Sequence, residues 1–314
     1  MLLQCQVGAG YNNTLGVPEP LMAIDRLYTQ HERHFEQFHY VYPVLSRRSQ
    51  GISVGINLNP DKICNFHCIY CQVDRVSETP TSFVDMERLV DELNHVLRLV
   101  VSGELFTTEK FHATPASLRR LNDIAFSGDG EPTTFRNFEA IVRACAAVKQ
   151  RHELDQVKLV LITNSSMLDR DNVQCALRVL DANQGEIWAK LDAGSEAYYR
   201  RVNRAATPFE RILGNLRLVA RQRPIVIQTL WMRIAGAAPP PPEIDAYCDR
   251  LKEITDAGGH IKLVQLCTVA RPAAESYVTP LPDDELDQIT EHIAQRTQIP
   301  CRAYYGARSE EDRL

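Results

Sequence analysis

Six short apolar runs alternate with six amphipathic segments along most of the chain. The apolar runs are rich in Ile, Val and Leu, as strands buried in a parallel sheet are, and occupy residues 52–58, 123–126, 157–163, 186–191, 224–231 and 261–266. The amphipathic segments, which we expect to be helices, occupy residues 84–101, 138–150, 169–180, 208–221, 243–256 and 283–295. Six strand–helix units with right-handed crossovers predict an α/β fold, a partial (β/α)6 barrel. Periodicity alone also permits a flat, doubly wound sheet.

This alternation divides the chain into three predicted parts. Residues 1–50 form an N-terminal extension, in which residues 23–37 have helical character. Residues 51–275 form the barrel core, and residues 276–314 form a C-terminal helical extension.

Composition and charge narrow the classes of function. Hydrophobic residues make up 44% of the 314 residues and the net charge is −5, so the chain lacks the overall charge of a strongly basic nucleic-acid binder. No stretch reaches the roughly 20 apolar residues of a membrane span, and the N-terminus has no basic start followed by an apolar run. We therefore expect a cytoplasmic protein without a membrane partner, whose nine cysteines form no disulfide framework.

Three of the cysteines, Cys64, Cys68 and Cys71, are clustered directly after the first predicted strand, whereas the other six are scattered singly. Thiolates at this spacing can converge on one metal centre. Three thiolates on a [4Fe–4S] cluster leave one iron with an open position, which the amino and carboxylate groups of S-adenosylmethionine can occupy. The alternative is a structural zinc with His67 as fourth ligand, in a non-catalytic binding module.

The pattern Cys64-x3-Cys68-x2-Cys71, with Tyr70 before the third cysteine, resembles the signature of the radical S-adenosylmethionine superfamily. The resemblance extends over about residues 51–271. Within the superfamily, the chain resembles the branch that contains wyosine-tRNA synthetase and its uncharacterised relatives. The phrases that carry it are GINLNPDKICNFHCIYCQ, FSGDGEPT, LITNSS, KLDAGSEAYYRRVNR and VQLCTVARP. It implies a partial (β/α)6 barrel, one [4Fe–4S] cluster, a cofactor contact at Tyr70, and reductive cleavage of S-adenosylmethionine to a 5′-deoxyadenosyl radical. It also implies an electron donor such as flavodoxin or ferredoxin.

Two polar segments follow predicted strands and are candidates for cofactor binding. Residues 127–133 read SGDGEPT, in which glycines permit close backbone approach, and the resemblance implies that this segment binds the amino group of S-adenosylmethionine. Residues 163–165 can reach ribose hydroxyls and the methionine carboxylate. The alternative for residues 127–133 is an ordinary turn. The alternative for residues 163–165 is capping of a helix or turn. The candidates are Gly128, Asp129, Gly130, Glu131, Thr163, Asn164 and Ser165.

Lys190 and Asp192 are two residues apart in the fourth predicted strand, so strand alternation places both on one face. If that face lines the barrel interior, the pair is a candidate catalytic pair, and Lys190 could bind a substrate carboxylate or carbonyl. A structural ion pair is the alternative.

Two classes of substrate are compatible with these motifs. An RNA substrate is suggested by the similarity to wyosine synthetases and by Tyr198 and Tyr199 among the arginines of residues 200–204. However, wyosine synthetases carry a second cluster on cysteines upstream of the radical loop, and here only Cys5 lies upstream. A small molecule or peptide fits the acidic chain. We expect no second cluster, with the reservation that folding could bring Cys267 and Cys301 together.

Overall fold

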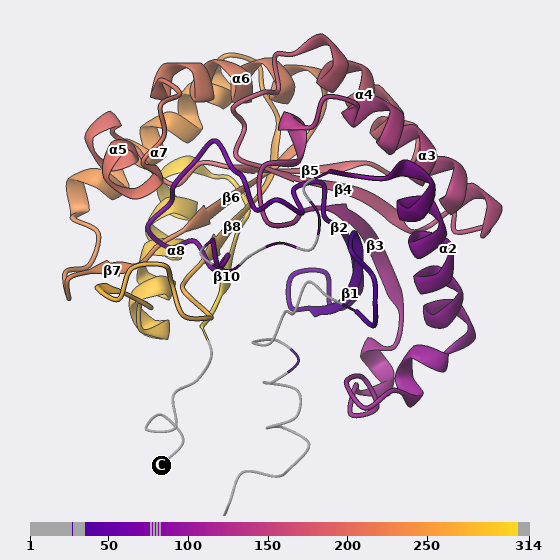
Figure 1. The fold of residues 1–314 in the computed structure, drawn as a ribbon. Coiled ribbons are helices and arrows are strands. Elements are labelled where there is room, and N and C mark those ends of the chain that lie inside the picture. The colour runs from indigo at the N-terminus through magenta and orange to yellow at the C-terminus, as the bar shows by residue number, and fades with distance from the viewer. Residues whose placement is uncertain are drawn as a thin grey trace, which may run out of the picture.

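The structure is a computed structural model that describes Leu27 and residues 35–306, except positions 76, 78, 80 and 82. Eight strands form one curled sheet in the order β1-β2-β3-β4-β5-β6-β8-β10, and helices cover its convex side (Figure 1). All neighbouring strands are parallel except β1 and β2. The sheet strands are Val41–Ser46 (β1), Gly51–Ile56 (β2), Leu121–Phe126 (β3), Lys158–Thr163 (β4), Glu186–Lys190 (β5), Ile225–Leu230 (β6), Ile261–Cys267 (β8) and Cys301–Tyr304 (β10).

The helices connect these strands in chain order. The α-helices are Met86–Ser102 (α2), Phe138–Arg151 (α3), Asp171–Asp181 (α4), Glu196–Asn203 (α5), Phe209–Gln222 (α6), Pro241–Asp256 (α7) and Asp283–Thr297 (α8). Short 3-10 helices occupy Glu104–Thr107 (η1), Ala116–Leu118 (η2) and Pro132–Thr134 (η3), and a small antiparallel pair joins Arg233–Ile234 (β7) to Val278–Thr279 (β9). No helix in the described part of the chain is long and apolar enough to cross a membrane.

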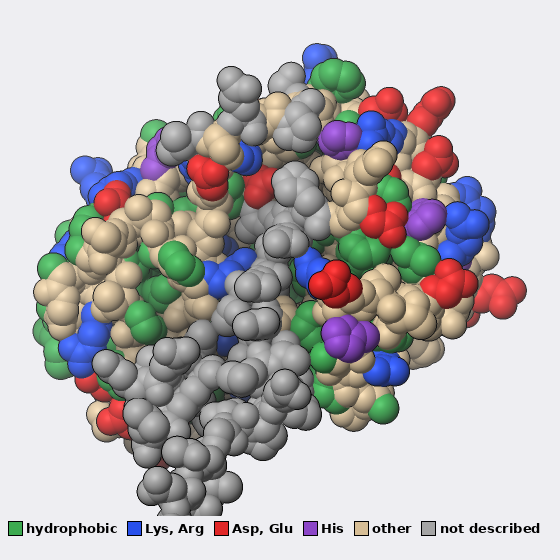
Figure 2. All heavy atoms as spheres, turned by 60° about the horizontal axis from the view of Figure 1, so that its bottom comes forward, with side chains coloured by type: hydrophobic (Ala, Val, Ile, Leu, Met, Phe, Trp, Pro, Cys, Tyr) green, Lys and Arg blue, Asp and Glu red, His purple; other side chains and the backbone are tan. Residues whose placement is uncertain are grey.

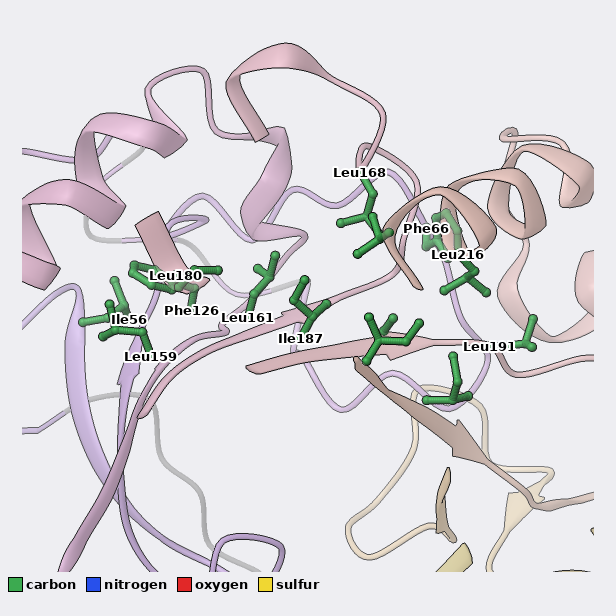
Figure 3. Packing of buried hydrophobic residues seen from close by; sticks show 14 of the residues in the cluster. Ile56, Phe66, Phe126, Leu159, Leu161, Leu168, Leu180, Ile187, Leu191 and Leu216 are labelled. Carbon is green, nitrogen blue, oxygen red and sulfur yellow. The ribbon is translucent and has the colours of Figure 1, made fainter. Parts of the chain in front are cut away.

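The two faces of the sheet have different surroundings, which follows from the alternation of side chains along each strand. Figure 3 shows outward-facing Phe126, Leu161 and Ile187 packing below helices that contribute Leu180 and Leu216. The inner face has a much smaller apolar cluster, composed of Ala125, Val160, Trp188 and Val226. Polar residues therefore occupy much of the concave side, where a ligand can be held.

The structure confirms the partial barrel and all six predicted strand–helix units, with ends that differ by a few residues. It adds two edge strands that periodicity did not indicate. Strand β1 pairs antiparallel with β2, so the boundary predicted at residue 50 falls inside a β-hairpin. Pro43 obscures this strand in the sequence, yet proline is tolerated at a sheet edge. Strand β10 pairs with β8 and comes from the predicted C-terminal extension. The helix predicted at residues 23–37 lies largely outside the described residues.

Candidate functional site

Cys64, Cys68 and Cys71 lie in the loop that leaves the carboxyl end of β2, and all three line one cavity of about 280 Å³. Their thiols are free and partly exposed. The Cys71 amide donates a hydrogen bond to the Cys68 carbonyl oxygen at 3.0 Å, which forms a tight turn between two of the thiols. Arg75 donates to the Cys71 sulfur at 3.5 Å, and Asn203 donates to the Cys68 sulfur at 3.5 Å. The loop thus directs three sulfur atoms toward the same space.

Helix α5 holds this loop in place. The amides of His67 and Ile69 donate to the carbonyl oxygens of Asn203 and Val202, at 3.1 and 2.9 Å. The Phe66 ring packs edge-on against the Tyr199 ring. The His67 side chain is exposed and is not among the residues that line the cavity.

Burial opposes the ionisation of the thiols in this loop. Burial raises the pKa of Cys64 and raises that of Cys68 to about 11, so these thiols are protonated at neutral pH until a metal displaces the proton. Across the described residues, no three His, Cys, Asp or Glu side chains are grouped to hold one metal ion. A zinc site needs its ligands around one atom, whereas a cubane cluster binds each thiolate through a different iron. His67, the fourth ligand of the zinc alternative, is exposed and does not line the cavity.

The SGDGEPT loop follows β3 and packs directly against the loop that carries the cysteines. A Cβ atom on Gly128 would lie closer than 3.0 Å to Asn57, and one on Gly130 closer than 3.0 Å to the Ile63 carbonyl oxygen. Asn57 also accepts a hydrogen bond from the Asp129 amide and donates one to the Asp129 carboxylate at 2.7 Å. The contact between the two loops therefore requires both glycines, whether or not a ligand also approaches them.

The Glu131 carboxylate is buried and already bonded within the protein. It accepts hydrogen bonds from the amide and hydroxyl of Thr133 at 3.2 and 2.5 Å, from the Thr163 hydroxyl at 2.6 Å and from the Asn164 amide at 2.6 Å. Burial raises the pKa of this carboxyl, while these hydrogen bonds oppose the shift. Glu131 therefore ties the loop after β3 to the end of β4, and its predicted contact with the cofactor stays a prediction.

The three residues at the end of β4 have different environments. Thr163 and Asn164 line the cavity, and the Asn164 side chain donates to Asn65, next to Cys64, at 2.8 Å. Ser165 is fully buried and does not line the cavity; its hydroxyl donates to the Lys190 carbonyl oxygen at 3.3 Å. Its backbone φ of 67° forms the sharp turn that leaves the strand. The structure therefore gives Ser165 a structural role.

Lys190 lies on the concave face, as predicted, and lines the cavity. Its ammonium nitrogen is 5.3 Å from the centroid of the Tyr70 ring. Burial lowers the pKa of Lys190, but Asp192 and the three clustered cysteines outweigh burial, and the net shift is upward. Lys190 therefore stays charged beside the cysteines.

Asp192 differs from the expectation, because β5 ends at Lys190 and Asp192 follows it. Its carboxylate is buried and does not line the cavity. It accepts hydrogen bonds from the Tyr70 hydroxyl, from the side-chain nitrogen of Asn203 at 2.9 Å and from the backbone amide of Leu230 at 3.0 Å. It connects the cysteine loop, α5 and β6. These contacts do not support its prediction as a catalytic residue, since the carboxylate binds its own scaffold.

Several residues in or beside the cavity were not singled out in the sequence. Arg75 and Asn203 contact cysteine sulfurs, Asn57 fixes the SGDGEPT loop, and Arg48 and Trp188 line the far end of the cavity. Asn57 could have been noticed, because a polar residue follows an apolar strand. The others come from segments whose proximity has no local pattern.

Cys267 and Cys301, the pair that folding could have brought together, can be placed by the register of β8 and β10. Cys301 pairs with Val264, whereas Cys267 pairs with Tyr304. The two are therefore three positions apart along a parallel pair, or about 10 Å at the usual rise per residue.

A family model for the radical SAM superfamily matches residues 58–233, which is more than half of the chain. The protein belongs to the radical SAM superfamily. The matched region includes the cysteine loop, the SGDGEPT loop and Lys190, and the curled sheet is the fold expected of that superfamily.

Solved structures with similar folds include radical SAM proteins. TYW1 with a lysine-pyruvate adduct bound is 16% identical with a TM-score of 0.52, covering 89% of this chain and 90% of that one. SuiB of Streptococcus suis bound to S-adenosylmethionine is 13% identical with a TM-score of 0.53, covering 82% and 52%. At these identities, the likeness concerns the fold.

Two curated proteins are similar to this chain in sequence. A GTPase Obg of Brachyspira hyodysenteriae is 23% identical over 261 residues, or 82% of this chain, but the chain spans only 34% of that protein. A UPF0026 protein of Helicobacter pylori strain J99 is 26% identical over 251 residues, covering 78% of this chain and 70% of its own length.

Proposed function

We propose that Cys64, Cys68 and Cys71 hold one [4Fe–4S] cluster and that the protein is an enzyme that cleaves S-adenosylmethionine reductively. The observation that carries this proposal is the convergence of three free thiols on one cavity in a chain of the radical SAM superfamily. When bound, the cluster supplies the electron that breaks the sulfonium C–S bond and yields a 5′-deoxyadenosyl radical. The electron comes from a donor such as flavodoxin or ferredoxin.

The chain's own residues bind and orient the reactants. Gly128 to Gly130 and the end of β4 at Thr163 and Asn164 form the rim that receives S-adenosylmethionine, with Tyr70 and Lys190 beside it. Glu131 keeps the rim in position through its internal hydrogen bonds. The Lys190 ammonium group binds a carboxylate or carbonyl oxygen of cofactor or substrate.

A small molecule is the favoured substrate, because the segment that suggested RNA is occupied by the protein itself. Tyr198 and Tyr199 are buried, and the Tyr199 ring stacks on Phe209 with a centroid distance of 5.0 Å. Arg200 pairs with Glu196, and Arg204 pairs with Glu275. The two tyrosine rings are therefore not open for bases to stack on.

The cluster assignment is tested by iron analysis of anaerobically reconstituted protein. The wild-type chain is expected to be brown and to hold about four irons, and a variant with alanine at all three cysteines almost none. Dithionite with S-adenosylmethionine should then yield 5′-deoxyadenosine only from the wild type. Iron retained in the triple variant would refute the ligand assignment, and about eight irons per chain would refute a single cluster. A colourless protein with one zinc would support a non-catalytic module.

We also propose a cytoplasmic location. A reducing compartment suits the eight free cysteines found among the described residues and the oxygen-sensitive cluster assigned to three of them. Localisation of a tagged chain by fractionation tests this point.

A further inference from the structure

The cavity extends from the cysteines down the concave face of the sheet to a second, basic end. Arg48, in the turn of the β1–β2 hairpin, lies there with its guanidinium carbon 4.9 Å from the centroid of the Trp188 ring. Both residues line the same cavity as the cysteines. Figure 2 looks toward the concave side and shows Lys and Arg side chains near the middle of that face.

The Trp188 ring is held rigidly as a platform for this arginine. Its indole nitrogen donates to Glu186 at 3.2 Å, and Glu186 is itself paired with Lys158 at 2.6 Å and with Lys262 at 3.5 Å. The indole therefore keeps one orientation, and stacking on it restricts the guanidinium without using its N–H donors.

Arg48 has no acidic partner at contact distance among the described residues. The Asp123 carboxylate lines the same cavity and senses the charge of Arg48, but it is 2% exposed and accepts a hydrogen bond from the Ser53 hydroxyl instead. No ion pair or hydrogen bond joins Arg48 to any residue that the structure describes, in contrast to Arg47, which donates to the Tyr305 carbonyl oxygen. A planar fork of donors that lines the cavity without a bonded partner among the described residues suits a carboxylate or phosphate group.

We infer that Arg48 on Trp188 binds an anionic group of the substrate, which rests on the proposed function above and restricts the substrate to small molecules that carry a carboxylate or phosphate. Trp188 and Lys190 are successive inward-facing residues of β5, so they are separated by about 6.6 Å along the strand. A substrate anchored at Arg48 therefore places its other end near Lys190 and the cysteines, within the length of a small metabolite.

The inference is tested by calorimetry on the reconstituted chain, which is first saturated with S-adenosylmethionine. Inorganic phosphate and succinate are then titrated in separately, at constant ionic strength. Glycerol serves as the neutral probe. We expect one of the two anions to bind, which identifies the group recognised, and R48Q to weaken that binding by at least about tenfold because a charge-assisted contact is lost. R48K, which keeps the charge but not the fork, should recover part of it. R47Q is the matched control from the same turn and should bind as wild type.

Two outcomes would overturn the anion site: no binding of either anion, or equal binding by R48Q. The proposed function is measured separately on the same samples, as 5′-deoxyadenosine released with dithionite in the absence of substrate. The control R47Q should release it at the wild-type rate. No release from any variant, together with Arg48-dependent anion binding, would refute the proposed function and leave the anion site standing.

Discussion

At the scale of single residues, the two predicted catalytic side chains separate into different roles. Lys190 projects into the cavity and keeps its charge beside the cysteines, whereas Asp192 accepts three hydrogen bonds from the scaffold. They differ because the strand ends between them, so alternation no longer fixes the direction of the second side chain.

Lys190→Met retains the apolar stem and removes the charge. We expect unchanged iron content and thermal stability, and a decrease of at least about tenfold in 5′-deoxyadenosine formation or substrate turnover, because a charged hydrogen bond to cofactor or substrate is lost. Iron analysis, a thermal melt and chromatography of the products measure these properties. Full turnover in this variant would show that Lys190 contacts neither cofactor nor substrate.

Asp192→Ala should act mainly on stability. The substitution leaves the Tyr70 hydroxyl, the Asn203 side chain and the Leu230 amide without their acceptor, and we expect the free energy of unfolding to fall by about 3 kcal/mol or more. The melting temperature and the iron content should decrease together. A variant with wild-type stability and no turnover would instead restore Asp192 as a catalytic residue.

At the scale of elements, the site depends on two loops in contact and on the end of β4. The cysteine loop and the SGDGEPT loop approach so closely that Gly128 and Gly130 have no room for a side chain. Glu131 then joins the second loop to β4. A substitution in the glycine loop is therefore expected to disturb the cysteines as well as the cofactor.

Gly130→Ala should lower the iron content, because the new Cβ would displace the Ile63 carbonyl oxygen next to Cys64. The matched control is Gly214→Ala in α6, where the nearest atom to a new Cβ is 4.0 Å away. That control should be neutral or should stabilise the protein by up to about 1 kcal/mol. Equal iron content in both variants would contradict the close contact between the loops.

Glu131→Ala removes the acceptor that four donors share, all of them in a buried environment. We expect a loss of about 2–3 kcal/mol in the free energy of unfolding and weaker binding of S-adenosylmethionine, with the cluster still present. Denaturant melts and equilibrium binding measure the two effects. Glu131→Gln, which retains one oxygen acceptor, should lie between the wild type and Glu131→Ala. Unchanged cofactor affinity in both would remove Glu131 from the rim.

At the scale of the whole molecule, the two faces of the sheet differ. Helices pack on the convex face, whereas polar and ionisable groups lie on the concave face. One consequence concerns Asp123 on β3. Burial raises the pKa of its carboxyl above 3.8, while the Ser53 hydroxyl and the charge of Arg48 oppose the shift. The folded protein therefore binds this proton more tightly than the unfolded chain.

The stability of the protein should consequently decrease as the pH rises above about 3.8, until the carboxyl of Asp123 is ionised in the folded state as well. Asp123→Asn keeps an oxygen that can accept the Ser53 hydrogen bond and removes the ionisation. The gain in melting temperature of this variant over the wild type should therefore increase from pH 4 toward neutrality. Two melting curves that run parallel across this range would contradict the buried, proton-retaining state of Asp123.

The sequence alone determined the six strand–helix units and the cysteine loop of this protein. Strand and helix periodicities are local, so residues within one segment reveal which face is buried, and the spacing of Cys64, Cys68 and Cys71 is local as well. Lys190 could be placed on the concave face for the same reason.

Only the tertiary structure decided which side chains meet, because contacts between distant segments leave no local pattern. Arg48 and Trp188 are 140 positions apart, yet they form one end of the cavity. Tyr198 and Tyr199, which suggested a surface for nucleotides, are instead buried because α5 packs beneath the cysteine loop. Periodicity gives the direction of a side chain within its element, whereas the curl of the sheet and the packing of its loops determine what that side chain contacts.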